Sequence, residues 1–192
     1  ANPAYGIYVK PEDILKRGID KLGQADITYA REKNYKIKLI PLAKEVDGKI
    51  ILYVLPKFVT KDNLLYGVEN ENNGVVVKAA FADEQFFFGK GAGGHPTGSA
   101  VLSDITALRY GYRYEFKKHA KSQEVTYSSD YELTVYLRYE DEQILDTLSF
   151  NSISERFYGQ EYKYVIGKIS LQQIIAHRDL IHRDGYFLAE IA

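Results

Sequence analysis

The chain has 192 residues, and its 25 Lys and Arg against 26 Asp and Glu give a formal net charge of -1. With 45% hydrophobic and 27% charged residues, the composition is typical of a globular protein with a core and excludes a disordered or fibrous chain. The near-neutral balance argues against nucleic acid as the main partner, because phosphate binding requires a basic excess. No apolar run approaches the roughly 18 residues that crossing a membrane requires, so we expect no membrane contact.

Cysteine and methionine are both absent. Without cysteine, this stretch has no disulfides, thiolate nucleophiles or cysteine-based metal centres, which fits a reducing compartment such as the cytoplasm. Because the chain has no methionine and its first residue is Ala1, we expect it to be a piece of a longer protein. No secretory or transit signal is recognisable in the sequence.

The charge differs between the two parts of the chain. Residues 1–120 hold 18 basic and 14 acidic side chains, and residues 121–192 hold 7 basic and 12 acidic ones. The polar stretch at 117–123 is typical of a linker. We therefore expect a larger domain over residues 1–120 and a small one over residues 124–192.

The first part predicts a mixture of helices and strands. Two helices are expected, at 24–33 and from about Gly98 to Arg109, the second burying Ala100, Val101, Ile105 and Leu108. Strand-like runs rich in Val, Ile, Phe and Tyr lie at 36–40, 49–54, 75–81 and 85–88. Asp47-Gly48 between two of them predicts a tight hairpin, and Pro56 is expected to end a strand.

The second part alternates strand and helix. Strands are expected at 132–139, 162–169 and 186–191, and helices at 143–157 and 171–177. This pattern predicts an α/β sandwich of about 60 residues, with one strand missing or merged. The fold class expected for the whole chain is α+β.

A glycine-rich stretch, Gly89 to Ala100, carries the clearest chemical signal. It follows the apolar run Phe86-Phe87-Phe88 and precedes a predicted helix, with Thr97 as a candidate N-cap. Glycines allow positive φ angles and let a flat ligand or phosphate approach the main chain, and Lys90 and the helix dipole favour an anion. The same stretch also fits a packing loop between elements, and the pattern alone does not separate the two interpretations.

The spacing Gly89-x-Gly91-x-x-Gly94 also matches the dinucleotide-binding fingerprint, with Glu115 about 20 residues on, where the ribose-binding acid is expected. We reject this interpretation on two grounds. Pro96 follows so closely that the helix is not expected to begin inside the motif, and the strands of a doubly wound sheet do not follow.

Two separated motifs give a family resemblance. GKGAGGHPTGSAVLSD at 89–104 resembles the signature G-x-G-A-G-x-x-P-T-x-S-A-V-x-x-D of homoserine dehydrogenases. The stretch from Gly18-Ile19 through Asp26-Ile27 and Ala30 to Lys38-Leu39-Ile40 is similar to a second conserved segment of that family. The resemblance covers roughly residues 5–110, in the family's order and spacing.

The resemblance implies an NAD- or NADP-dependent enzyme that interconverts homoserine and aspartate 4-semialdehyde, in the biosynthesis of threonine and methionine. In the family, the cofactor lies on an N-terminal Rossmann domain, and the catalytic lysine and substrate-binding acids precede the Gly18-Ile19 segment. We therefore expect no catalytic residue in this chain and no activity from it alone. The resemblance assigns cofactor contact to Gly93, then Gly91 and Gly89, and it implies a cytoplasmic homodimer.

For the first part, the resemblance implies the homoserine dehydrogenase substrate-domain fold, a mixed β-sheet with helices on one face. The second part resembles an ACT regulatory domain, a small α/β sandwich that often binds an amino acid. Here Glu140-Asp141-Glu142 stand where the ligand-binding turn is expected, and their charges would repel the carboxylate of threonine. This run is best explained as a solvated helix N-terminus, and His177 and His182 are five residues apart, so no metal site is expected.

Two hypotheses remain. The chain is either the substrate-domain part of a homoserine dehydrogenase, or a non-catalytic regulatory, amino-acid-binding or dimerisation module with the same fold.

Overall fold

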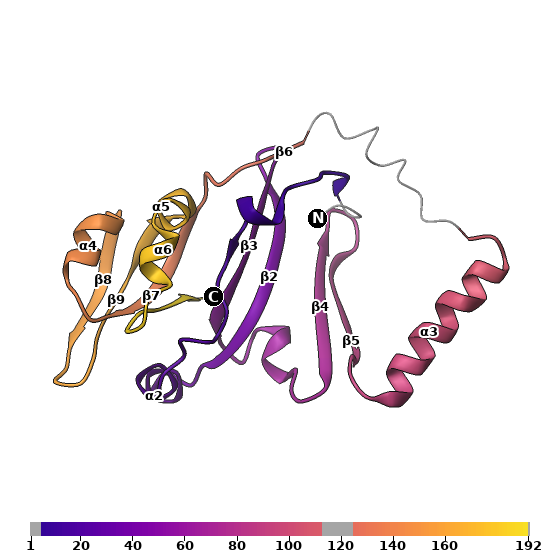
Figure 1. The fold of residues 1–192 in the computed structure, drawn as a ribbon, viewed down its shortest axis with the longest axis horizontal. Helices are drawn as coiled ribbons and strands as arrows, with labels where there is room; N and C mark the ends of the chain where they lie inside the picture. The colour runs from indigo at the N-terminus through magenta and orange to yellow at the C-terminus, as the bar shows by residue number, and fades with distance from the viewer. Residues whose placement is uncertain (1–4, 113–124, 192) are drawn as a thin grey trace. The chain divides into compact units, whose positions relative to one another are not determined.

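The computed structural model describes residues 5–112 and 125–191 (Figure 1). The contacts divide the chain into two compact units: Ala1–Thr60 with Lys117–Ala192, and Lys61–Phe116. The predicted α+β class with a mixed sheet is confirmed, because the first unit holds an eight-stranded sheet with both parallel and antiparallel pairs. The predicted linker at 117–123 lies outside the described residues.

The sheet of the first unit is built around one long hairpin. Strands β2 (Lys36–Val46) and β3 (Lys49–Val59) pair antiparallel along their full lengths. Asp47 and Gly48 between them both have positive φ angles, 50° and 74°, as the predicted tight turn requires. Both strands are longer than expected.

Pro56 does not end β3, contrary to the prediction. On the side of β3 away from β2, strand β1 (Leu15–Lys16) pairs with Tyr53 and Val54, and β10 (Phe187–Ile191) pairs with Lys57 and Phe58. Pro56 lies in the gap between these two segments, so its missing N–H removes no ladder hydrogen bond.

The C-terminal part forms a βαββαβ arrangement. Its elements are β7 (Glu132–Tyr139), α4 (Gln143–Leu148), β8 (Ser152–Tyr158), β9 (Lys163–Ser170), α5 (Leu171–Ala176) with α6 (Arg178–Ile181), and β10. The strands run in the order β10-β7-β9-β8, and each neighbouring pair is antiparallel. This is the ferredoxin-like arrangement.

The long helix predicted over 143–157 is wrong. Helix α4 ends at Leu148, where Ser149 takes a left-handed φ of 50°, and the chain returns as β8. This edge strand is the one that the sequence pattern left missing or merged. Its side chains alternate between exposed and half-buried, a weak pattern next to a strong apolar helix start.

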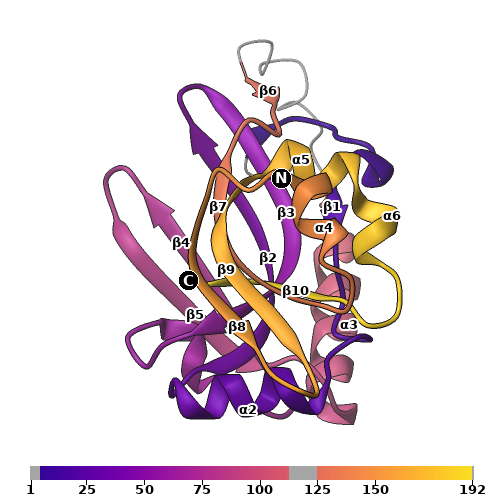
Figure 2. The same ribbon diagram turned by 90° about the vertical axis from the view of Figure 1, so that its left-hand side faces the viewer.

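Two apolar clusters lie on opposite faces of the sheet. Along β7, Leu133, Val135 and Leu137 face one cluster, which α4, α5 and α6 cover, and Tyr136 faces the other. Helix α2 (Gln24–Glu32) covers the second face with Tyr29 and Ala30. Figure 2 shows α4, α5 and α6 gathered together, away from α2.

The units found by contacts differ from the expected domains of residues 1–120 and 124–192. Strand β10 pairs parallel with β3 in register Glu190↔Lys57, and the short β6 (Thr126–Tyr127) pairs parallel with the start of β3. One continuous sheet therefore joins segments from both sides of the expected boundary.

The second unit contains the 3-10 turn η2 (Leu64–Gly67), the antiparallel ribbon of β4 (Asn72–Ala79) and β5 (Asp83–Lys90), and helix α3 (Gly94–Arg109). The ribbon packs locally on η2, because Gly74 leaves room for Leu65, Val68 and Phe86. None of the unit's described apolar side chains is fully buried.

Candidate functional site

The glycine-rich stretch forms the connection from β5 to α3. Gly89 and Lys90 are the last residues of β5, and α3 begins at Gly94 with Gly93 as its N-cap. The prediction that Thr97 caps a helix from about Gly98 is wrong. Gly93 has a φ of 110°, and its carbonyl accepts the first hydrogen bond of the helix from Thr97, so the helix starts one turn earlier.

The structure separates the three candidate glycines by what each position requires. A side chain at Gly91 would overlap the side-chain amide of Asn73. Gly93 requires glycine for its positive φ. Gly89 has neither requirement, since nothing lies within 4 Å of an added Cβ and its φ is not positive.

Gly91 is therefore explained by its own chain, because Asn73 of β4 occupies the space that a side chain would fill. Its backbone N–H also donates to the Glu71 carbonyl at 2.9 Å. Gly89 and Gly94 are different, since both leave open space beside the main chain. An external group can approach the backbone at these two positions.

The charge of Lys90 is not free. Its Nζ lies 3.1 Å from Glu71 Oε1, and the carboxylate also takes a hydrogen bond from its own backbone N–H. That backbone bond and the Lys90 ammonium lower the pKa of the Glu71 carboxyl. The positive end of the helix dipole at Gly94 remains as the feature that favours a negatively charged group.

The structure changes the reason for rejecting the dinucleotide-binding fingerprint. Pro96 stands in the first turn of α3, where its missing N–H is tolerated, so the helix does begin inside the glycine motif. Within the described residues, however, β5 pairs only with β4, and the pair is antiparallel. The ribbon and helix are not the parallel βαβ unit that the fingerprint requires.

Helix α3 does not bury the residues that were predicted to be buried. Val101, Ile105 and Leu108 lie three and four residues apart on one side of the helix and are 53%, 58% and 68% exposed. Leu102 beside them is also exposed, and Ala100 is not buried. The periodicity is that of a packed helix, but nothing in the described part of its own unit covers this stripe.

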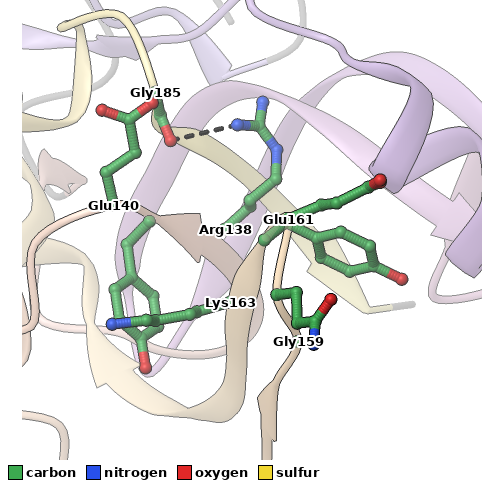
Figure 3. A pocket seen from close by; sticks show the side chains of 9 residues that line it. Arg138, Glu140, Gly159, Glu161, Lys163 and Gly185 are labelled. Carbon is green, nitrogen blue, oxygen red and sulfur yellow. Dashed lines mark hydrogen bonds between the residues drawn. The ribbon is translucent and has the colours of Figure 1, made fainter.

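A separate small pocket lies in the first unit, at one end of the βαββαβ arrangement (Figure 3). Its wall comes from the end of β7, the turn between β8 and β9, and Gly185, and includes Arg138, Glu140, Glu161 and Lys163. Its volume of about 180 Å³ is below the roughly 300 Å³ at which ligand pockets usually begin. A dinucleotide does not fit there.

The charged groups of this pocket are largely engaged in internal contacts. Arg138 donates to the Gly185 carbonyl at 3.0 Å, as Figure 3 shows. Lys163 Nζ lies 2.9 Å from Glu142 Oε1, and this hydrogen bond raises the pKa of the Lys163 ammonium. Of the acidic run, Asp141 accepts from the backbone N–H of Gln143 at the start of α4, as a helix N-terminus favours.

The histidines do not gather at the glycine turn or at the small pocket. His95 is exposed in the first turn of α3, and His177 contacts the Gln173 carbonyl one turn earlier on α5. His182 contacts Arg17, and His119 lies outside the described residues. Among residues 5–112 and 125–191, no group of three or more His, Asp or Glu side chains is arranged to hold a metal ion.

The family model for homoserine dehydrogenase matches residues 1–106, more than half of the chain. The chain belongs to the homoserine dehydrogenase family. Two curated relatives are the homoserine dehydrogenase of Helicobacter pylori, 41% identical over 108 residues, and that of Bacillus subtilis, 33% identical over 113 residues. These alignments cover 56% and 59% of this chain and 26% of each relative.

Solved homoserine dehydrogenases share the fold along the whole chain. The crystal structure from Thiobacillus denitrificans matches with a TM-score of 0.70 at 24% identity, covering all of this chain and 50% of that one. One from Staphylococcus aureus matches with a TM-score of 0.59 at 26% identity and the same coverage. The chain thus spans about half the length of these solved enzymes. No helix in the described part has the length and apolar character needed to cross a membrane.

Sequence reasoning missed the buried polar contacts of the first unit. Arg17, Asp26 and Lys57 are almost fully buried and pair with residues more than 100 positions away. Asp26 was noted only as a motif residue, and no local pattern reveals a partner so distant in the chain.

Proposed function

We propose that this chain is the part of an NAD- or NADP-dependent homoserine dehydrogenase that folds beside a cofactor-binding domain, and that it is inactive alone. The observation that carries the proposal is the family match over residues 1–106, with the signature stretch placed at the turn from β5 into α3. The reaction is the interconversion of homoserine and aspartate 4-semialdehyde, in the cytoplasmic biosynthesis of threonine and methionine.

The shape of the turn supports cofactor contact there. Gly89 and Gly94 leave the main chain bare although the fold itself does not require glycine at either position. Gly93, through its positive φ, turns the chain so that the start of α3 follows directly. The first N–H groups of a 16-residue helix then lie beside the bare stretch, and they favour a phosphate or another negative group.

The residues of the turn would contact a bound nicotinamide nucleotide through their main chain and would not supply reacting groups. When bound, the nicotinamide ring supplies or accepts the hydride. Gly93, Gly91 and Gly89 would form main-chain contacts, with Gly91 approached from the side opposite Asn73. These contacts orient the ring and exclude water, and no side chain of the turn takes part in proton transfer.

The exposed stripe on α3 supports the need for a neighbouring domain. Val101, Leu102, Ile105 and Leu108 are all more than half exposed, although their spacing is that of a buried helix face. A stripe of this kind is covered in a stable assembly, since large exposed apolar patches usually mark an interaction surface. Catalytic lysine and substrate-binding acids would come from outside this chain.

The proposal is tested by restoring the rest of the enzyme. The region of the Helicobacter pylori relative that precedes the match is fused to this chain, and NAD(P)-dependent oxidation of homoserine is measured. We expect activity from the fusion and none from the chain alone. A folded fusion that binds cofactor but does not oxidise homoserine, or activity from the chain alone, would contradict the proposal.

A second candidate function is a non-catalytic regulatory or dimerisation module. The observation that favours it is the βαββαβ arrangement of β7 to β10, which is the topology expected of an ACT-like domain. Its acidic turn, Glu140-Asp141-Glu142, makes threonine a poor ligand, because these carboxylates repel the carboxylate of an amino acid. Calorimetric titration with threonine should show no heat of binding, whereas saturable binding would favour the regulatory function.

A further inference from the structure

Arg17 is a buried cation with one side-chain hydrogen-bond partner within residues 5–112 and 125–191. The residue follows β1 and is 2% exposed, and its Nη1 lies 2.6 Å from Nδ1 of His182, just after α6. The Nε and Nη2 atoms are buried and have no hydrogen-bond partner among the described residues. The guanidinium therefore depends on a single neutral acceptor from the other end of the chain.

The contact fixes the protonation of His182. A guanidinium only donates hydrogen bonds, so Nδ1 of His182 must present its lone pair and the ring proton must be on Nε2. Protonation of this neutral ring at Nδ1 would place two donors, both on cations, 2.6 Å apart. Unlike an arginine–carboxylate pair, this contact exists only while the histidine is neutral.

The nearby charges do not offset this conflict. Asp20 favours the charged forms of both Arg17 and His182, and Asp179 of α6 favours the charged histidine, but Arg178 on the same helix opposes it. Lys21 and Asp184, which lie four and two residues beyond the two partners in the sequence, pair with each other at 2.5 Å.

We propose that Arg17 and His182 form a pH-sensitive latch, in which neutral His182 ties the segment after β1 to the C-terminal helix α6 and protonated His182 releases it. The geometry carries this proposal, since no described residue offers an acceptor to the buried Nε and Nη2 of Arg17, and the contact joins residues 165 positions apart.

The direction of the pH effect follows from the burial of the ring. Burial first, and then the charge of Arg17, lower the pKa of His182 below its ordinary value of 6.5. The unfolded chain consequently binds more protons than the folded chain near that pH. The latch contributes its stability above pH 6.5 and loses it as the pH falls through the lowered pKa of the folded state.

The test measures urea unfolding of the full chain from about pH 8 to about pH 5, a range that brackets an ordinary histidine. In His182→Asn the side-chain oxygen replaces Nδ1 as an acceptor for Arg17 but does not titrate. We expect this variant to match the wild type near the upper limit and to lose less of its midpoint urea concentration toward the lower one. The matched control, His177→Asn, should keep the wild-type pH dependence.

A direct titration of His182 in the wild-type chain tests the proposal even if the His182→Asn variant does not fold. The ring signals of His182 in the wild-type chain, followed by NMR, should titrate below pH 6.5, and in Arg17→Gln the midpoint should shift upward. Titration of His182 at or above 6.5, an unchanged midpoint in Arg17→Gln, or an unchanged pH dependence in His182→Asn would each overturn the latch.

Discussion

Asp26 and Arg138 form an ion pair in which both carboxylate oxygens accept from the same guanidinium Nε, at 2.9 and 3.1 Å. Asp26 is fully buried at the start of α2, where it also accepts from the Gly23 backbone N–H at 2.8 Å and from the Tyr136 hydroxyl at 3.0 Å. The pair thus fixes α2 to β7, across 112 residues of sequence.

Removing the charge of Asp26 should strongly lower the stability of the folded chain. In Asp26→Asn the half-buried Arg138 loses its counterion at the fully buried Asp26 position, and we expect the free energy of unfolding to fall by about 3 kcal/mol, as for other broken pairs with a buried partner. Chemical unfolding measures the change.

The matched control for this variant is Asp184→Asn, which removes a carboxylate that is paired with Lys21 at the surface. This variant should leave the unfolding midpoint close to that of the wild type, because exposed ion pairs contribute little. Equal effects of the two substitutions would show that the Asp26–Arg138 contact has no special structural role.

Alkaline pH should unfold the first unit before its buried tyrosines ionise. Burial, together with Asp26, raises the pKa of Tyr136, and burial, together with Glu190, raises that of Tyr53. Burial also raises the pKa of Tyr139 to about 12. The folded chain therefore holds protons that the unfolded chain releases near pH 10, so stability is present below that pH and is lost above it.

The measurement is a spectrophotometric titration of tyrosinate together with circular dichroism. We expect the exposed tyrosines to ionise first and the remaining absorbance change to coincide with loss of secondary structure. A single smooth titration of all tyrosines in a chain that stays folded would contradict this account.

The sequence predicts local features of this fold well where the chain itself determines them. The turn at Asp47-Gly48, the helix at 24–33 and the strand at 132–139 depend on nearby residues, and all three are confirmed. Other features of the fold depend on contacts with segments distant in the sequence. Pro56 stands within β3 because of a gap between two partner strands, and the residues of β8 form a strand because β9 lies beside them.

The glycine turn shows the same limit for the candidate site. Its position between strand and helix follows from the sequence, but the role of each glycine depends on the backbone angle and the space beside it, which the sequence does not show. Only the structure reveals that Asn73 fills the space beside Gly91, and that Gly89 faces open space.

Separating the chain at the expected domain boundary should impair the folding of both pieces. In residues 124–192 alone, β10 would lose its partner strand β3. Glu190 would also lose its ion pair with Lys57, in which Lys57 Nζ lies 2.6 Å from Glu190 Oε2. We expect this piece to show poorly dispersed amide signals by NMR, and to gain dispersion when residues 1–120 are added. A well-dispersed spectrum from residues 124–192 alone would instead support the two-domain division.

The most direct measurement for the proposed role of the glycine turn compares Gly89→Ala with the parent sequence in the active fusion enzyme. The fold accepts a methyl group at this position, so the thermal unfolding midpoint should not change. If the bare main chain lies against the nicotinamide nucleotide, the KM for NAD(P) should rise about tenfold or more. An unchanged KM and kcat for Gly89→Ala would contradict cofactor contact at this turn.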